Sequence, residues 1–273
     1  GKIKPLTAQK KKQIYSYIES MSNRALRCIA AAYKEEHVVK NDSVEENLIF
    51  LGVAGSMDPP RIEVKDAVLK CKMAGVKPVM ITGDHKNTAL AIAKSINICT
   101  TDDQAITGDE LEKMSDEELA KRVCKLRVFA RVSPNHKLRI VKAFKEVGEV
   151  VAMTGDGVND APALKQANIG IGMGSGTDVA KDASAMILTD DNFATIVKSV
   201  SNGRGIYNNI KNSIKFLLSG NTSGIIAVLY SSIMALPMPF AAVHLLFINL
   251  LTDSLPAIAI GMEESNRDLL KDK

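Results

Sequence analysis

The sequence has few cysteines, little net charge and no recognisable signal segment, and each absence narrows the class of protein. Four cysteines occur in its 273 residues, none in a CxxC pair: Cys28, Cys71, Cys99 and Cys124. We therefore expect reduced, mostly buried thiols, which suit a cytosolic domain better than a secreted one. The net charge of +4 is too small to indicate a nucleic-acid-binding protein. Residues 1–5 lead into a basic run rather than the apolar core of a signal peptide.

Short apolar runs alternate with helical patterns from about residue 48 onward. Strands are expected over 48–54, 76–82, 128–130, 150–154, 169–172 and 185–188, and helices over 60–74, 86–96 and 134–147. This alternation predicts an α/β protein with right-handed βαβ units and a mostly parallel sheet. Residues 1–47 are a short charged piece with an amphipathic helix pattern, in which 25–30 fit either a strand or a helix.

Two apolar segments near the carboxyl end, 216–236 and 240–260, have the length that crosses a bilayer core. An uncharged Pro-Met-Pro turn separates them. Basic residues lie outside both segments: Lys211, Lys215, Arg267, Lys271 and Lys273. The positive-inside rule then places both outer ends in the cytosol. A buried helix pair in a soluble protein is the alternative, and the apolar length and the flanking charges argue against it.

The run TGDGVNDAPA, residues 154–163, directly follows the apolar stretch 150–152. A buried strand that ends in a glycine-flanked pair of carboxylates, Asp156 and Asp160, places them at one rim of a parallel sheet, where ligands bind in open α/β folds. Mg²⁺ prefers carboxylate and water oxygens, and it commonly bridges protein carboxylates to a substrate phosphate. For an isolated Gly-Asp-Gly, a polar turn that caps the next helix would be the simpler interpretation.

Several motifs in fixed order make the chain similar to one family. They are DPPR (58–61), MITGD (80–84), FARVSP (129–134), TGDGVNDAPAL (154–164), MGSGT (173–177) and GRGIYNN (203–209). Together they resemble the P-type cation-transporting ATPases, and the calcium-pump branch is the most similar. The resemblance implies a haloacid-dehalogenase-like Rossmannoid parallel sheet followed by a two-helix transmembrane hairpin.

The resemblance also implies a division of the chain. Residues 1–47 would be the end of a nucleotide-binding domain, and 48–205 a phosphorylation domain without its nucleophile strand. Residues 206–264 would be a transmembrane hairpin continuous with a cytosolic helix, and 265–273 a cytosolic tail. The protein would then be integral to a membrane, with the α/β domain in the cytoplasm.

The family's site residues can be placed on matching positions. Thr82 would hydrogen-bond the transferring phosphoryl group, Lys137 would neutralise it, and Asp156 would bind Mg²⁺ with support from Asn159 and Asp160. This suits phosphoryl transfer, which needs positioning and positive charge more than covalent help. The positions that resemble nucleotide contacts are Arg27, Gly83, Asp84 and Arg131. As isolated residues, Thr82 could instead cap a helix and Lys137 could be a solvated surface lysine.

The second apolar segment carries oxygen ligands: Asn249, Thr252 and Asp253. A carboxylate within a membrane helix is costly, so it is a functional candidate by default. Pro256 frees the backbone carbonyl of Thr252. Asn221, on the preceding segment, matches another calcium-pump ligand, and hard oxygens suit Ca²⁺ better than a soft metal. A polar packing network between helices is the alternative.

The sequence departs from the family in two ways. Gly224 stands where many two-site pumps carry a glutamate, which favours one ion per cycle. The nucleophile motif Asp-Lys-Thr-Gly-Thr is missing, and the only Asp-Lys pair is Asp272-Lys273. Aspartyl-phosphate chemistry requires that carboxylate. We therefore expect part of a longer pump, truncated at both ends and inactive alone.

The parent pump would use ATP and Mg²⁺, and its further partners would be the transported cation (Ca²⁺ favoured, Mn²⁺ the alternative), the lipid bilayer and the remaining segments of the pump, without nucleic acid. Two other interpretations stay open. One is a non-catalytic regulatory or assembly protein that binds Mg²⁺ or nucleotide. The other is a membrane-tethered phosphatase, for which the sequence has no DxDxT motif.

Overall fold

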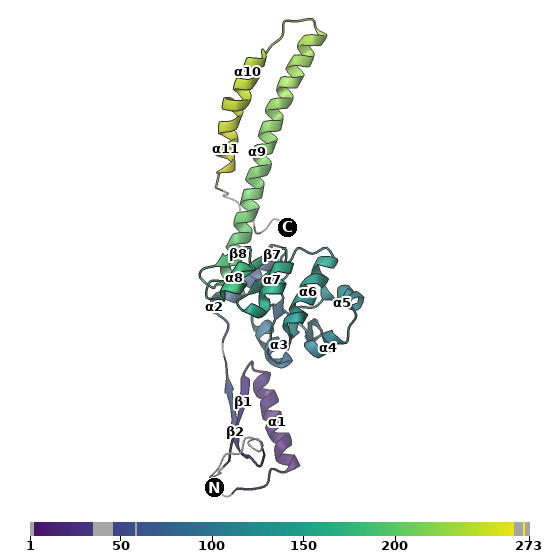
Figure 1. The fold of residues 1–273 in the computed structure, drawn as a ribbon, viewed down its shortest axis with the longest axis vertical. Helices are drawn as coiled ribbons and strands as arrows, with labels where there is room; N and C mark the ends of the chain where they lie inside the picture. Colours follow the sequence, from purple (N-terminus) through teal and green to yellow (C-terminus); the bar gives the residue numbers. More distant parts are fainter. Residues whose placement is uncertain (1–2, 35–45, 58, 265–269, 271–273) are drawn as a thin grey trace. The chain divides into compact units, whose positions relative to one another are not determined.

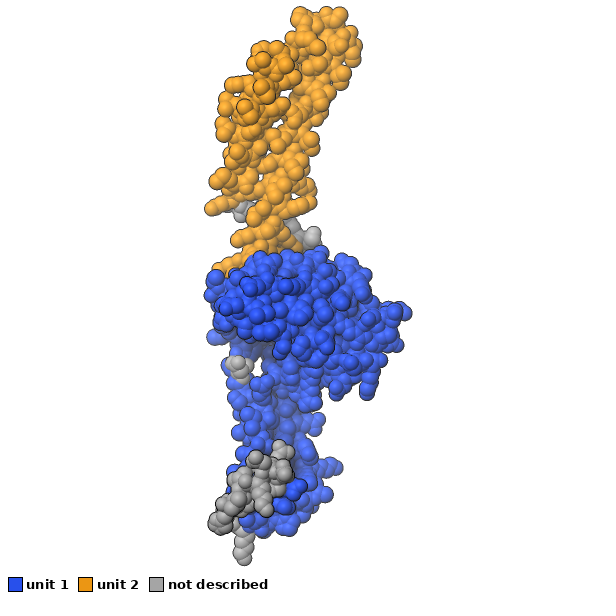
Figure 2. All heavy atoms as spheres, in the orientation of Figure 1, with its two compact units in different colours: residues 1–72, 76–194 blue, residues 73–75, 195–273 orange. Residues whose placement is uncertain are grey.

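The computed structural model describes residues 3–34, 46–57, 59–264 and 270. Asp58 of the DPPR motif, and the carboxyl-terminal Arg267, Lys271 and Asp272-Lys273, lie outside the described residues. The chain divides into two compact units (Figure 2). Unit 1 comprises Gly1–Lys72 and Val76–Ala194, and unit 2 comprises Met73–Gly75 and Thr195–Lys273. The four-part division expected from the sequence stays a prediction.

Unit 1 begins with a helix and an antiparallel hairpin. Helix α1 (Ala8–Ser22) starts after Thr7, whose hydroxyl accepts the backbone N–H of Lys10. Strand β1 (Arg27–Tyr33) resolves the ambiguity over 25–30, and it pairs antiparallel with β2 (Ile49–Ser56). The strand expected over 48–54 is therefore present, but its partner is β1 rather than a strand of a parallel sheet.

The remaining strands of unit 1 form two parallel sheets, which confirms the predicted α/β architecture. In the first, β5 (Val128–Ala130) lies between β3 (Met80–Ile81) and β4 (Ala105–Thr107). In the second, β7 (Ile169–Met173) lies between β6 (Ala152–Gly155) and β8 (Met186–Leu188). The strand expected over 76–82 is shortened to β3, since Pro78 has no N–H to give to a ladder.

Helices connect these strands (Figure 1). They are α2 (Ile62–Met73), α3 (Lys86–Ser95), α4 (Gly108–Glu112), α5 (Asp116–Val123), α6 (Pro134–Glu146), α7 (Ala161–Gln166) and α8 (Asp178–Asp182), with 3₁₀ turns η2 (Asp102–Gln104) and η3 (Val158–Asp160). The predictions over 60–74, 86–96 and 134–147 correspond to α2, α3 and α6. Capping boxes start α4 at Thr107 and α5 at Ser115, each closed by a glutamate three residues on.

The two parallel sheets share apolar packing. Phe129, on the central strand β5, is fully buried in a cluster with Leu111 and Leu119. Ile81, on β3, packs against that cluster and also against the cluster around Met153 on β6. No strand pairing joins β3 to β6 in the part of the chain that the structure describes. Within the described ranges each of these two strands therefore has one open edge, although their side chains contribute to a common core.

Unit 2 is a helical hairpin. Helix α9 (Phe193–Ile233, its first two residues in unit 1) is 41 residues long, and the returning arm consists of α10 (Ala242–Phe247), the π-helical turn η4 (Ile248–Asp253) and α11 (Ser254–Gly261). The returning arm lies alongside α9 (Figure 1). Two stretches, Phe193–Ile233 and Ala242–Gly261, are long and apolar enough to cross a membrane by length and composition.

Candidate functional site

The buried carboxylate of Asp160 organises the turn after β6. Its Oδ1 accepts a hydrogen bond from Lys137 Nζ at 2.6 Å, and the side chains are 7% and 23% exposed for Asp160 and Lys137 respectively. Its Oδ2 accepts the backbone N–H groups of Asp156 and Gly157, each at 3.3 Å. Ionised partners strengthen such hydrogen bonds. One carboxylate thus fixes both the predicted phosphate-neutralising lysine and the backbone of the predicted metal ligand.

Two glycines make this close arrangement possible. A Cβ added to Gly155 would lie 2.5 Å from Asp160 Cβ, and one added to Gly176 would lie 2.9 Å from the carbonyl oxygen of Asp156. That carbonyl also accepts the backbone N–H of Thr177 at 2.8 Å. The segment after β7 therefore packs directly against the segment after β6, and side chains at these two positions would separate them.

The side chain of Asp156 is exposed at the carboxyl end of β6, and Asn159 is exposed on the same turn. Among the described residues, no group of three or more His, Cys, Asp and Glu could hold a metal ion alone. This composition fits Mg²⁺, which typically binds through one or two carboxylates together with substrate phosphate and water. Asp156 presents an exposed carboxylate at this turn, whereas the carboxylate of Asp160 is already paired with Lys137.

A second group of predicted residues meets at the end of β3. The backbone N–H of Asp84 donates to Thr82 Oγ1 at 3.1 Å, and the Thr82 hydroxyl donates to Asp84 Oδ2 at 3.2 Å. Arg27 Nη2 lies 2.9 Å from Asp84 Oδ1. The Arg27 side chain is 74% exposed, so this ion pair contributes little stability. Thr82 makes a local turn with Asp84 and does not cap a helix, because α3 starts after His85. The ion pair brings two of the predicted nucleotide contacts, Arg27 and Asp84, together.

The ends of β3 and β5 are joined by backbone hydrogen bonds. The N–H of Arg131 donates to the carbonyl of Asp84 at 3.1 Å, and the N–H of Val132 donates to the carbonyl of Thr82 at 3.3 Å. Arg131 is exposed and has a φ of 51°, an uncommon conformation for a residue with a side chain. Four of the predicted residues therefore lie together at the carboxyl ends of strands in the first parallel sheet: Thr82, the exposed Gly83, Asp84 and Arg131.

Helix α6, which carries Lys137, is anchored by a contact that the sequence reasoning missed. The Ser133 backbone N–H donates to His136 Nδ1 at 3.1 Å, and the His136 N–H donates to Ser133 Oγ at 3.4 Å. His136 Nε2 contacts Glu112 at the end of α4. A hydroxyl residue three positions before a side-chain acceptor is a helix-start signal that could have found it. This capping box, formed by Ser133 and His136, fixes the first turn of α6 and with it the backbone of Lys137.

In unit 2, the carboxylate of Asp253 is buried against α9. The residue is 7% exposed, and its Oδ2 is the buried side-chain oxygen without a hydrogen-bond partner among the described residues. A Cβ added to Gly220 on α9 would lie 3.4 Å from that oxygen. Gly220 directly precedes Asn221. A buried carboxylate oxygen without a partner is costly unless something else pairs with it.

The other predicted membrane ligands differ from Asp253 in burial. Asn221, Asn249 and Thr252 are exposed. The turn η4 that holds the last two is π-helical, which the sequence analysis did not predict. Single π-helical turns occur frequently at functional sites. The sequence signal for an irregularity was Pro256, which frees the carbonyl four residues earlier.

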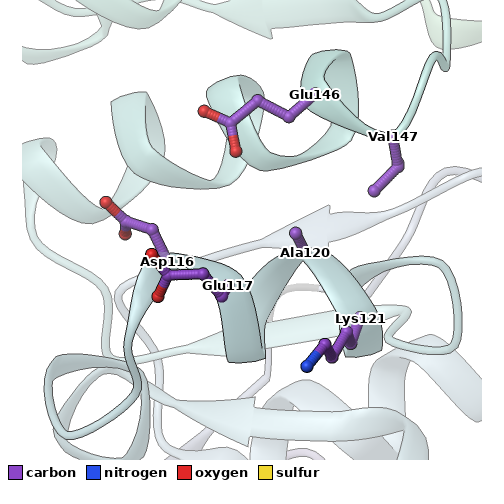
Figure 3. Close-up of a pocket in the computed structure, with 6 residues that line it drawn as sticks. All are labelled: Asp116, Glu117, Ala120, Lys121, Glu146 and Val147. Atoms are coloured by element: carbon purple, nitrogen blue, oxygen red, sulfur yellow. The ribbon is translucent and has the colours of Figure 1, made fainter.

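A surface hollow lies between α5 and α6 (Figure 3). It is lined by Asp116, Glu117, Ala120, Lys121, Glu146 and Val147. The hollow is open and contains none of the predicted site residues. Its acidic side chains do not converge on one point in the close-up, and we assign it no role.

Comparisons with known proteins agree with this architecture. Residues 8–168 match the model of the haloacid dehalogenase-like hydrolases, and residues 138–200 match a second model of that description. Residues 237–273 match the family described as cation transporting ATPase, C-terminus. The sequence is 52% identical to "Calcium-transporting ATPase 1" of Lactococcus lactis over 99% of this chain. It is 42% identical over its whole length to "Calcium-transporting ATPase 3, endoplasmic reticulum-type" of Arabidopsis thaliana.

The chain spans 31% of the Lactococcus relative and 28% of the Arabidopsis relative. A family model covering more than half of the chain, together with the two parallel sheets and relatives aligned along nearly all of it, confirms the resemblance inferred from the motifs. The chain belongs to the haloacid dehalogenase-like hydrolases, in the branch that includes the P-type calcium-transporting ATPases.

Proposed function

We propose that this chain is the part of an ATP-driven cation pump that contains the phosphoryl-transfer edge and two membrane helices with cation ligands. The observation that carries the proposal is the combination on one chain of two features. One is the Lys137–Asp160 pair beside Asp156 at the end of a strand. The other is the buried carboxylate of Asp253 on an apolar helix, one oxygen of which has no hydrogen-bond partner among the described residues. Similarity to calcium-transporting ATPases along the chain supports it.

At the phosphoryl edge, Lys137 places positive charge against the equatorial oxygens of the transferring group. The Thr82 hydroxyl, which donates to Asp84 in the structure, would turn to donate a hydrogen bond to that group. Asp160 holds the lysine in place through its 2.6 Å contact. Asp156 would bind Mg²⁺, which when bound neutralises charge on the phosphate oxygens, and Asn159 supports this turn. Because Lys137 is only partly exposed, phosphate would reach it from the open side of the turn.

The nucleotide would lie at the carboxyl ends of β3 and β5. Arg27, Gly83, Asp84 and Arg131 are the proposed contacts for ATP. The support is geometric: Arg27 reaches Asp84, and the backbone of Arg131 is tied to the carbonyl of Asp84. An exposed arginine suits a phosphate or a stacked base, because its guanidinium is planar and always charged.

The nucleophilic aspartate of the pump would come from a strand outside this sequence. Thr82 follows β3 and Asp156 follows β6, and each of these strands has one open edge among the described residues. A parallel strand added between them would place its terminal carboxylate at the same rim. We therefore propose that the isolated chain neither forms a phosphoenzyme nor transports ions.

In the membrane, Asp253 would bind the transported cation, with Asn221, Asn249 and Thr252 as further ligands. The exposed side chains of these three residues would have to turn toward Asp253, or toward ligands from another helix, when the ion binds. Amide, hydroxyl and carboxylate oxygens suit Ca²⁺, with Mn²⁺ as the alternative. Gly224 offers no carboxylate and has open space beside it, which supports a single ion.

We also propose that both arms of the unit 2 hairpin span the bilayer, with the α/β unit in the cytoplasm. Apolar length supports the spans. The basic residues Lys211 and Lys215, before the apolar half of α9, support the orientation. Accessibility labelling of cysteines introduced at Lys215 and Met238 would test it, because only the second should react from the outside.

The experiment that tests the function is a chimera. This chain replaces the matching 31% of the Lactococcus lactis relative, and ⁴⁵Ca²⁺ uptake and ATP hydrolysis are measured in inverted membrane vesicles. We expect Ca²⁺-dependent hydrolysis that Lys137→Ala and Asp253→Asn abolish. Asn212→Ala, an exposed position on α9, should leave it unchanged. A folded, membrane-inserted chimera without Ca²⁺- or Mn²⁺-dependent activity would contradict the proposal.

The isolated chain separates the two alternative functions. Mg²⁺-dependent hydrolysis of p-nitrophenyl phosphate by the chain alone would favour a membrane-tethered phosphatase. Nucleotide binding without any hydrolysis, together with an inactive chimera, would favour a regulatory or assembly protein.

A further inference from the structure

Three side-chain hydrogen bonds join α9 to the end of α11. Asn209 Nδ2 donates to the carbonyl of Gly261 at 3.3 Å and to that of Glu263 at 2.6 Å. One turn along α9, Ser213 Oγ donates to the carbonyl of Ala257 at 2.9 Å. We call these two donors with their acceptors the Asn209–Ser213 clamp.

The clamp joins two helices that have little other packing to hold them in place. Only a small share of the apolar stretches of α9 and the returning arm is buried, and Ile214 and Ile258, beside the clamp, are more than half exposed. In lipid there is no hydrophobic driving force between helices, so close packing and interhelical hydrogen bonds determine how they associate. The carbonyls at a helix end also lack intrahelical partners, and Asn209 satisfies one of them, that of Gly261, together with the carbonyl of Glu263 two residues beyond α11.

The spacing of the clamp defines a register. Asn209 and Ser213 are four residues apart on α9, and their acceptors Gly261 and Ala257 are four apart on α11, so the contacts repeat once per antiparallel turn. Further along α9, Gly220 faces the carboxylate of Asp253. A helical side chain leans toward the amino end of its helix, which for Asp253 is the direction of Gly220. A slip of one turn, about 5.4 Å, would break the clamp and move Asp253 away from Gly220.

We infer that Asn209 and Ser213 are positioning residues for the cation site, which they serve by fixing the register that places Asp253 beside Gly220. They do not bind the ion themselves. The effect on cation binding rests on the proposed function, whereas the register of the two helices can be measured separately.

The register is tested on the chain itself in lipid nanodiscs. Spin labels on cysteines at Ile225 of α9 and Ile258 of α11, both exposed, report the separation of the helices along their axes, with Cys28 and Cys124 replaced by serine. We expect one narrow distance distribution for the unmodified clamp. Asn209→Ala combined with Ser213→Ala should broaden or shift it by up to about 5.4 Å, one helical turn. An unchanged distribution in the double variant would overturn the inference.

Two controls and one rescue accompany this measurement. Asn212→Ala and Ser232→Ala remove the same side-chain types at exposed positions of α9 and should leave the distribution unchanged. Ser213→Thr keeps the hydroxyl and should retain the register. Loss of the register in both Ser213→Thr and the control variants would show that the clamp is not what determines it.

The functional consequence is measured in the chimera. Ser213→Ala should raise the Ca²⁺ concentration for half-maximal ATP hydrolysis about threefold, the effect of one average interhelical hydrogen bond. Asn209→Ala removes two such bonds and should raise it about eightfold, and the double variant about twentyfold. The maximal rate should change little, because the phosphoryl edge is untouched. An unchanged midpoint, with Asp253→Asn inactive, would overturn the positioning role and leave the proposed function standing. A chimera without cation dependence would contradict the proposed function, and the distances would still decide the register.

Discussion

Lys137 and Asp160 are 23 residues apart in the sequence, and their charged atoms lie 2.6 Å apart at the end of β6. The lysine belongs to α6 and the aspartate to the turn η3. Because the other oxygen of the same carboxylate accepts the N–H groups of Asp156 and Gly157, the pair connects a helix, a turn and the exposed Asp156. The pair thus determines the position of the Lys137 charge, the shape of the turn and the position of the predicted metal ligand, Asp156.

Asp160→Asn should destabilise the α/β unit. The variant keeps the shape of the side chain but loses the ionised acceptor for Lys137 and for two backbone N–H groups, which costs about 1–3 kcal/mol in the free energy of unfolding. Urea unfolding followed by circular dichroism measures it. Asp156→Asn is the matched comparison: it is exposed, so its stability should change by less than about 0.5 kcal/mol while the chimera loses Mg²⁺-dependent hydrolysis. Equal destabilisation by both variants would contradict this distinction.

Gly155→Ala should be far more disruptive than Gly157→Ala. A Cβ at position 155 would lie 2.5 Å from Asp160 Cβ, whereas the nearest atom to one at position 157 is 3.7 Å away. Overpacking of this kind typically costs about 1–3 kcal/mol. Thermal unfolding of both variants, followed side by side, provides the check, and similar melting temperatures would show that the turn can open to accept a methyl group.

Stability near α4 should depend on pH through Glu110. The backbone N–H of Thr107 lowers the pKa of this carboxyl from its usual value, and the Thr107 hydroxyl and Lys86 lower it further. A depressed folded-state pKa gives stability that is present above the unfolded-state pKa and is lost as the pH falls through the folded-state pKa. Glu110→Gln should therefore lower the free energy of unfolding by only about 0.5 kcal/mol near neutral pH, because the carboxyl is half exposed. In acid the loss should be smaller, because the carboxyl of the unmodified protein is then protonated. Urea unfolding of the variant and the unmodified protein, near neutral pH and in acid, measures the difference in stability between them. A difference that does not change with pH would contradict this prediction.

The four thiols should react at different rates with iodoacetamide. Burial raises the pKa of the Cys71 and Cys99 thiols, and both side chains are buried, so little reactive thiolate is available near neutral pH. Cys28 and Cys124 are partly exposed and should be modified first. Mass spectrometry of peptides after short labelling, with and without urea, identifies the sites. Rapid labelling of Cys71 in the folded protein would show that α2 opens readily.

The longer elements of the fold were predictable because their patterns are local. The expected helix 86–96 ends one residue beyond α3, and the expected helix 134–147 ends one residue beyond α6. The short β4, α4, α5, α7 and α8 were not predicted, since elements of three to eight residues give little periodicity. The pairing of β2 with β1 depends on contacts across the chain, and no residue pattern within β2 determines its partner.

The candidate sites were predictable as residues but not as contacts. Motif resemblance indicated Thr82, Lys137, Asp156 and Asp160, yet no spacing rule connects Lys137 to Asp160. The arrangement of Asp253 against Gly220 likewise depends on the π-helical turn η4, which shifts the face that its residues present. Asn249 and Thr252 share that turn and are exposed, so proximity in sequence to Asp253 was a poor guide to their surroundings.

The open edges of β3 and β6 also have a consequence for handling the protein. An unpaired strand edge is a template for pairing with any extended segment, and natural proteins usually cover or blunt such edges. Both strands are short, with two and four residues, which limits but does not remove this tendency. The isolated α/β unit should therefore self-associate as its concentration rises. A polypeptide that supplies the proposed missing strand should compete with this self-association and act as a solubilising partner.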